Sequence, residues 1–220
     1  MLERLRQEVW RMNQELPRQG LVTMTSGNVS GRDPETNYVV IKPSGVRFEE
    51  MKPEDLVVVD LDGNALEGVF RPSVDLPNHL YIYRHKSGIN GIVHTHSNYA
   101  TSFAALGQPI RPYLTAIADE FGGEIPCAEY ASNEADNIGR AVVRAMNRGP
   151  AVLLKNHGVF TFGPSPSAAL KAAVMVEDVA KTVYLTLLRG KPDELSPDEI
   201  EKWWDRYHHR YGQEKMEGVR

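Results

Sequence analysis

The segment at residues 150–163, PAVLLKNHGVFTFG, constrains the fold most strongly, because it predicts two strands joined by a tight turn. Two apolar runs flank a polar turn at residues 156–158, as in neighbouring strands of a sheet. Residues 165–188 follow with a long helical pattern that ends near Gly190, a typical helix stop. We therefore expect a sheet covered by at least one long helix.

The rest of the chain alternates irregularly between strand and helix patterns. Further strands are expected at residues 38–41, on both sides of the Asp-Gly turn within 56–68, and at 88–96, and further helices at 2–16, 76–86, 97–106, 134–146 and 196–211. Residues 23–37 and 107–132 predict loops, because they are rich in polar residues, glycine or proline. Irregular alternation with one clear hairpin predicts an α/β fold with a mixed sheet covered by helices.

Charge and composition exclude several classes of protein. The 220 residues carry a formal net charge of −4, whereas a nucleic-acid-binding chain normally shows a basic stripe. No segment approaches the roughly 18–20 consecutive apolar residues of a membrane span, and the charged, amphipathic residues 1–16 predict no signal peptide. Cys127 is the only cysteine, so no internal disulfide can form. These features favour a soluble single-domain protein of the cytoplasm without nucleic-acid or membrane partners.

A metal site is predicted where the strand at residues 88–96 ends. Residues i and i+2 of a strand face the same side, so His94 and His96 project together. Catalytic zinc commonly takes three protein ligands and keeps one open position, and His157, in the turn of the hairpin, is the best third ligand. Of the other histidines, His79 either supports such a site or lies on a helix surface. The remaining three, at positions 85, 208 and 209, are expected to be solvated.

Two polar loops have the composition of an anion site. Thr25, Ser26, Gly27 and Asn28 offer hydroxyl, amide and backbone N–H donors, and residues 44–45 offer a second cluster, with Lys42 adding a charge. Taken alone, residues 25–31 are better explained by an ordinary surface loop.

Seven ordered motifs resemble the class II aldolase and L-ribulose-5-phosphate 4-epimerase family, which includes the adducin head domains. They are TSGNVS (25–30), KPSGV (42–46), PSVD (72–75), GIVHTHS (91–97), ADEFGGEIPC (118–127), NHG (156–158) and YGQ (211–213). The resemblance implies a three-layer α/β/α single domain over residues 1–220 and a sugar-phosphate substrate. It also implies a homotetramer with active sites between neighbouring subunits, and one Zn²⁺ per subunit, with Mn²⁺ or Co²⁺ as alternatives.

The same resemblance assigns further residues to the site. The implied phosphate-binding residues are Ser26, Gly27, Asn28, Lys42, Ser44, Gly45 and Ser73. Asp75 is implied as a fourth metal ligand, an acid/base group or both, whereas Asp119 and Tyr211 are implied as acid/base groups, with Tyr211 acting on a neighbouring subunit's substrate. Val74 is a departure, because the family usually carries a second serine there.

The residues leave two enzymatic functions open. Epimerases of the family carry aspartate at the position of Asp75 and match Asp119 and Tyr211, which favours a 4-epimerase working by retro-aldol and aldol steps through an enediolate. The short segment between residues 127 and 157, and its NHG motif, instead favour an L-fuculose-1-phosphate aldolase-like lyase. Structural explanations also exist: a surface carboxylate for Asp119, a helix N-cap for Asp75 and simple packing for Tyr211. A non-catalytic adducin-like scaffold would be expected to have lost the metal site.

Overall fold

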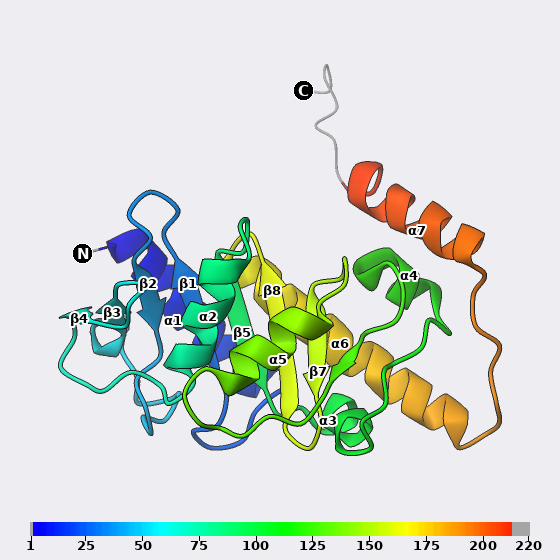
Figure 1. Ribbon diagram of the computed structural model, residues 1–220, viewed down its shortest axis with the longest axis horizontal. Coiled ribbons are helices and arrows are strands. Elements are labelled where there is room, and N and C mark those ends of the chain that lie inside the picture. The colour runs from blue at the N-terminus through cyan, green and yellow to red at the C-terminus, as the bar shows by residue number, and fades with distance from the viewer. Residues whose placement is uncertain (1, 213–220) are drawn as a thin grey trace, which may run out of the picture.

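The strands form a single mixed sheet in the computed structural model, which describes residues 2–212 (Figure 1). The strands are β1 (Asn28–Arg32), β2 (Val39–Ile41), β3 (Val57–Val59), β4 (Ala65–Glu67), β5 (Gly91–Thr95), β6 (Cys127–Ala128), β7 (Ala151–Leu154) and β8 (Gly158–Gly163). Their order in the eight-stranded sheet is β4-β3-β2-β1-β5-β8-β7-β6. Only β6 and β7 pair in parallel, and every other neighbouring pair is antiparallel.

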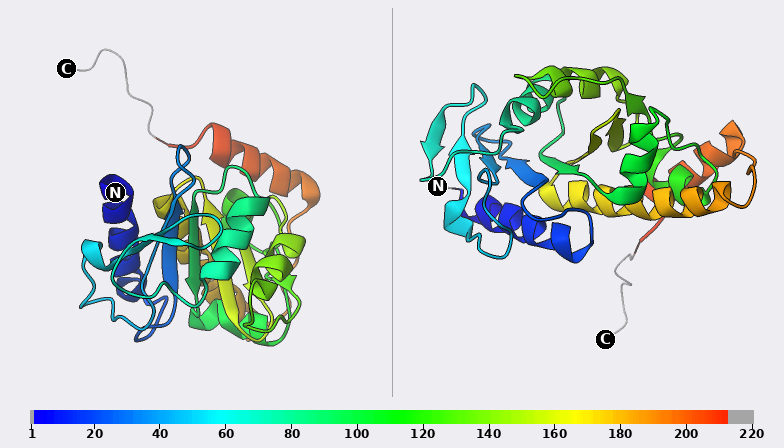
Figure 2. Two further views of the ribbon diagram at one scale, coloured as in Figure 1. Left: turned by 60° about the vertical axis from the view of Figure 1, so that its left-hand side comes forward. Right: turned by 90° about the horizontal axis from the view of Figure 1, so that it is seen from below.

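Helices cover both faces of this sheet, which confirms the expected three-layer α/β/α architecture. They are α1 (Glu3–Arg18), α2 (Leu76–His85), α3 (Asn98–Ala105), α4 (Thr115–Phe121), α5 (Asn137–Ala145), α6 (Pro166–Leu187) and α7 (Pro197–His209), with a 3₁₀ turn at Pro53–Asp55. α1 and α6 pack on one face, and α2 and α5 lie together on the other (Figure 2). Within the described residues, no helix has both the length and the apolar character needed to cross a membrane.

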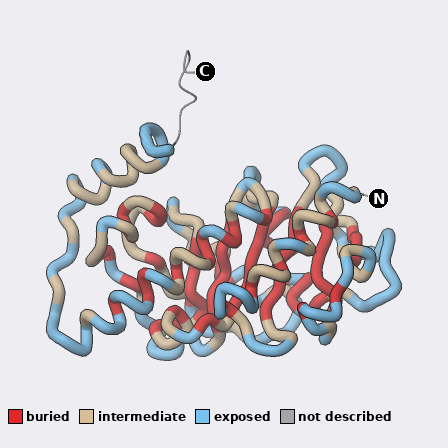
Figure 3. The backbone as a smooth tube through the Cα atoms, turned by 180° about the vertical axis from the view of Figure 1, so that it is seen from behind, coloured by how far each residue is buried: buried red, intermediate tan, exposed pale blue. Residues whose placement is uncertain are grey.

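The inner strands are buried on both faces, whereas the edge strand β4 is exposed, so the side chains of the inner strands alternate between two cores rather than between core and solvent. On β2, Val39 and Ile41 pack in the core beneath α2 and α5, whereas Val40 between them packs toward α1. β7 repeats the pattern, with Val152 and Leu154 in the first core and Leu153 against α6. The buried residues accordingly run through the strands (Figure 3).

Three glycines lie side by side across the middle of the sheet. Gly31 of β1 is paired with Gly91 of β5, which is paired with Gly163 of β8. A Cβ atom on Gly91 would come within 2.2 Å of the Ser165 carbonyl oxygen, and one on Gly163 within 2.7 Å of the Ala168 Cβ. The missing side chains therefore let the start of α6 approach the sheet closely.

Three elements lie where the sequence predicts loops. β1 falls in the polar segment 23–37, and both α4 and the short strand β6 fall in the proline-bearing segment 107–132. β1 lacks a strand pattern because Asn28 and Ser30 point into a buried polar region instead of an apolar core. Cys127 is half-buried in β6.

Candidate metal centre and active site

The three predicted histidine ligands meet at one end of the central strands. His94 stands near the end of β5 and His96 just beyond it, and His157 occupies the turn between β7 and β8. Because β5 and β8 are antiparallel, the end of one lies beside the start of the other. One ring nitrogen from each histidine lies within 4.8 Å of the others, and this is the one such cluster among the described residues.

Hydrogen bonding and burial prepare the imidazoles for a cation. His94 Nδ1 donates to the Val159 carbonyl oxygen at 2.9 Å, which leaves Nε2 with a free lone pair. His96 Nε2 lies 3.0 Å from that atom, so a proton or a cation must stand between the two nitrogens. Burial lowers the pKa of His94 to about 3 and also lowers the pKa of His96 and of His157. All three rings are therefore neutral at pH 7, the form that binds metals, and the donor set fits a divalent ion.

Gly158 is required beside this cluster. A Cβ atom there would lie 2.4 Å from the Thr95 carbonyl oxygen and 2.7 Å from His96 Cδ2. Any side chain would push the end of β5 away from the turn that carries His157.

Asp75 stands at the N-cap position of α2 but makes no side-chain capping bond, so capping does not account for it. Its Oδ2 accepts a hydrogen bond from Asn28 Nδ2 at 2.7 Å and another from Ser73 Oγ at 3.5 Å. Burial alone would raise the pKa of Asp75, but the nearby histidines and the Asn28 amide outweigh that effect and lower it. Asp75 is therefore a carboxylate that borders the histidines without belonging to their cluster.

One cavity of about 310 Å³ brings the predicted metal and phosphate residues together. Its lining includes Ser26, Gly27, Asn28, Lys42, Ser44, Gly45, Ser73, Asp75, His94, His96 and His157. Asn133 also lines it, and sequence reasoning missed this residue because it stands in an irregular loop without a motif. Val74 also lines the cavity, with 69% of its surface exposed.

Lys42 connects the two polar loops through hydrogen bonds to their backbone carbonyl groups. Its Nζ donates to the Val46 carbonyl at 2.7 Å and reaches the Thr25 and Pro43 carbonyls at 3.4 Å. Burial lowers the pKa of Lys42 to about 8. The ammonium group therefore holds both loops in place beside the cavity while adding positive charge to it.

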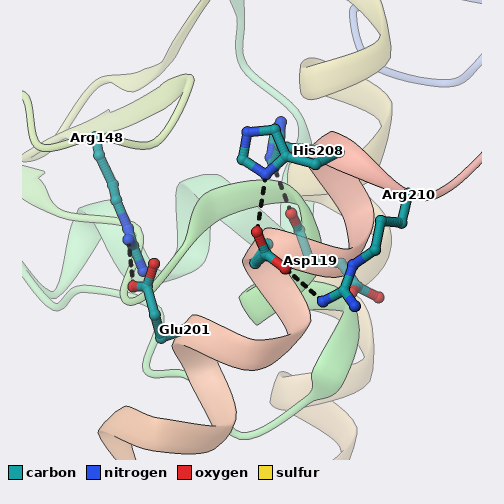
Figure 4. A network of polar contacts seen from close by, with 7 residues as sticks. Asp119, Arg148, Glu201, His208 and Arg210 are labelled. Carbon is teal, nitrogen blue, oxygen red and sulfur yellow. Dashed lines mark hydrogen bonds and ion pairs between the residues drawn. The ribbon is translucent and has the colours of Figure 1, made fainter.

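Asp119 and Tyr211 lie away from the cavity in the same chain. Asp119 belongs to α4, and Arg206 Nη2 of α7 approaches its Oδ1 at 3.6 Å. His208 Nε2, also of α7, contacts the backbone carbonyl oxygen of Asp119 at 3.1 Å (Figure 4). Tyr211 follows α7, 66% exposed, and its ring stacks on Tyr207. Gln213, the last residue of the YGQ motif, lies outside the described residues.

Asp119 and the histidine cluster lie toward opposite ends of β5. His208 of α7 borders a second cavity with residues 86–89, which precede β5, whereas the metal-site histidines stand at its other end. One chain therefore does not bring Asp119 to its own histidine cluster.

Comparison with known proteins identifies the family. The model for the class II aldolase and adducin N-terminal domain matches residues 7–184. The chain belongs to this family. It is 41% identical over 207 residues to L-ribulose-5-phosphate 4-epimerase UlaF of Salmonella paratyphi C (strain RKS4594), covering 89% of this chain and 90% of that protein.

Solved structures agree with this class II aldolase fold. An L-fuculose 1-phosphate aldolase superposes with a TM-score of 0.88 at 33% identity, over 93% of this chain and 96% of the other. The L-fuculose-1-phosphate aldolase from Thermus thermophilus gives a TM-score of 0.71 at 28% identity, over 87% and 99% of the two chains.

Glu177 of α6 holds the helix that follows His96 in this class II aldolase family member. Its Oε1 and Oε2 accept the Tyr99 and Ala100 backbone N–H groups, each at 2.9 Å, at the start of α3. Glu177→Gln retains a single acceptor oxygen, so one N–H loses its acceptor and the other donates to a neutral amide. The substitution should lower the free energy of unfolding by about 1–2 kcal/mol. Urea denaturation measures this, with the exposed neighbour Asp178→Asn as control; equal effects of the two substitutions would contradict the assignment.

The buried histidines make stability depend on pH. Burial lowers the pKa of His79 to about 4, so below its ordinary value of 6.5 the unfolded chain takes up a proton that the folded chain refuses. The unfolding free energy of the chelator-treated protein should therefore fall as the pH drops from 6.5 toward 4. Between pH 7 and 5 the loss should be smaller in His79→Phe by about 2 kcal/mol, at 1.36 kcal/mol per pH unit. Denaturation at both pH values tests this, and parallel losses in the two proteins would disprove it.

Proposed function

We propose that the protein is a metal-dependent L-ribulose-5-phosphate 4-epimerase, a single-domain cytoplasmic enzyme with one Zn²⁺ per subunit. The observation that carries the proposal is the histidine cluster lining one cavity with two donor-rich loops, in a chain 41% identical to an epimerase over nearly its whole length. Three neutral imidazoles suit zinc, and also Mn²⁺ or Co²⁺.

His94, His96 and His157 would hold the ion, with Asp75 as the adjacent carboxylate. A divalent ion there supplies Lewis-acid stabilisation of the negative charge that develops on oxygen when the carbon–carbon bond breaks. Asn28 keeps Asp75 in place through its 2.7 Å hydrogen bond.

The phosphate group has a cradle on the same cavity. Ser26, Ser44 and Ser73 offer hydroxyl groups, Gly27 and Gly45 offer backbone N–H groups in tight turns, and Asn28 and Lys42 complete the proposed phosphate-binding set. Lys42 contributes mainly by holding the two loops together, because its ammonium already bonds to backbone carbonyls. Binding the phosphate fixes the sugar relative to the histidines, so the cradle positions the bond that breaks.

Epimerisation requires a proton to leave one hydroxyl group and return after the aldehyde has turned, with an acid/base group on each side. We assign Asp119 and Tyr211 to this step from a neighbouring subunit of a homotetramer. Their separation from the histidines within one chain supports an active site shared between subunits.

The decisive experiment incubates the purified protein with L-ribulose 5-phosphate and assays D-xylulose 5-phosphate and aldehyde release separately. The epimerase proposal predicts rapid formation of the 4-epimer with little free aldehyde. Aldehyde release from L-fuculose 1-phosphate without epimerisation would instead support the aldolase alternative, which is motivated by the similarity to an L-fuculose 1-phosphate aldolase at 33% identity. Metal analysis addresses the scaffold alternative, since recovery of much less than one ion per subunit would argue against either enzyme.

A further inference from the structure

His79 is completely buried on α2, one helical turn after Asp75. Its Nδ1 lies 2.7 Å from Ser30 Oγ, and that hydroxyl lies 2.8 Å from the hydroxyl of Tyr83. His79 Nε2 is buried without any hydrogen-bond partner among the described residues. Burying an unsatisfied ring nitrogen costs about 1–3 kcal/mol. An apolar side chain at this position would avoid that cost, so the presence of histidine suggests a role for its ring nitrogens.

The hydroxyl groups determine which nitrogen carries the hydrogen. If Tyr83 donates to Ser30 and Ser30 donates to His79 Nδ1, both hydroxyl hydrogens are used and Nε2 carries the ring hydrogen. The opposite direction leaves the Tyr83 hydroxyl hydrogen without an acceptor among the described residues, in addition to an unsatisfied Nε2. Because buried polar groups are nearly always paired, the first arrangement is favoured. His79 then presents an N–H donor.

Asp75 is an acceptor that helix geometry places on the same side of α2 as His79. Residues i and i+4 of a helix share a face, and side chains lean toward the helix N-terminus, so His79 leans back over Asp75. The two groups also interact electrostatically, since the Asp75 charge opposes the effect of burial on the pKa of His79. Side-chain donors to Asp75 among the described residues reach Oδ2 only, which leaves Oδ1 for other partners.

Aromatic packing through Phe160 also connects His79 to the histidine cluster. Its ring packs edge-on against Phe160 at 5.8 Å, and Phe160 stacks on His94 at 4.4 Å. A change in the His79 ring would therefore alter the surroundings of both the Asp75 carboxylate and the His94 imidazole.

We propose that His79 is a positioning residue: Tyr83 and Ser30 fix its Nε2–H tautomer, and this N–H orients the Asp75 carboxylate by electrostatic attraction rather than by a direct hydrogen bond, beside the histidines of the proposed metal site. Only the expected effect on metal affinity rests on the proposed function. The tautomer itself is a property of the protein that can be measured without metal or substrate.

A two-dimensional ¹H–¹⁵N spectrum of the ¹⁵N-histidine-labelled protein distinguishes the tautomers directly. His79, assigned through the loss of its signals in His79→Phe, should carry its hydrogen on Nε2 at pH 7. In Ser30→Ala the fixed tautomer should give way to a mixture. A hydrogen on Nδ1 in the wild-type protein, or an unchanged tautomer in Ser30→Ala, would overturn the proposal.

Metal affinity tests the consequence. Competition with a chromophoric chelator for Zn²⁺ should show 10–100-fold weaker binding in His79→Phe, the usual effect of losing a group that orients a ligand. His85→Phe, on the exposed end of the same helix, is the matched control and should bind as the wild type does. Unchanged affinity in folded His79→Phe would overturn the positioning role. If the wild-type protein itself bound no Zn²⁺, the proposed function would fail, while the tautomer measurement would still decide the assignment of the Nε2 hydrogen.

Discussion

His96→Ala is expected to abolish metal binding and to reduce turnover of L-ribulose 5-phosphate on the order of 10³-fold or more. The substitution removes one of three imidazoles whose nitrogens lie within 4.8 Å of one another. A Lewis acid stabilises the developing charge by several kcal/mol, and each 1.36 kcal/mol corresponds to a tenfold rate change. Atomic absorption on the dialysed protein and a coupled epimerase assay measure the two effects.

The control for this substitution is His85→Ala, because His85 is exposed on α2 and stacks only on Tyr81. It should retain full metal content and activity. Full turnover by metal-depleted His96→Ala would show that the reaction does not depend on the ion held by these histidines.

Asp119→Asn should slow epimerisation by about 10²–10⁴-fold, the usual contribution of a general acid or base, while sparing a slow release of aldehyde. Bond cleavage would still be supported by the histidine cluster, but the aldehyde would lack the group that returns a proton after it turns. Separate assays of the epimer and the aldehyde measure this partition. Asp193→Asn, in the exposed segment before α7, is the control. Equal rates of epimerisation in wild type and Asp119→Asn would mean that Asp119 has only a structural role, as the ion-pair partner of Arg206.

Mixing two inactive variants tests whether the site is shared. If His96 and Asp119 act from different subunits, hybrids of His96→Ala and Asp119→Asn contain some interfaces with both wild-type groups. Random assembly of a cyclic tetramer from equal amounts predicts roughly one quarter of wild-type activity. Failure to regain activity in demonstrated hybrids would place both groups in the same subunit's site.

The sequence predicts the grouping of the three histidines well, because strand alternation and a tight turn are local features of the chain. Strand alternation places His94 and His96 together, and the tight turn at His157 allows few conformations. The strands 150–163 and the long helix after them are likewise confirmed, since their apolar patterns are strong. The phosphate-loop residues come together in one cavity as expected, although their roles stay predictions.

Other features depend on contacts between distant segments. β1 could not be predicted from apolar periodicity, because Asn28 and Ser30 bond to Asp75 and His79 of α2, more than 40 positions away. Asn133 joins the cavity from an irregular loop. His79 left two interpretations open, and only packing shows that it lies inside the protein instead of on a helix surface.

The glycine row formed by Gly31, Gly91 and Gly163 makes the separation between α6 and the sheet a collective property. Enlarging any one residue would force the same helix outward, so a second enlargement would meet space already opened by the first. The effects of Gly31→Ala and Gly163→Ala on stability should therefore sum to more than the effect of the double variant. Such non-additivity would mean that the three glycines together set one distance between α6 and the sheet, so that a second substitution costs less than the first.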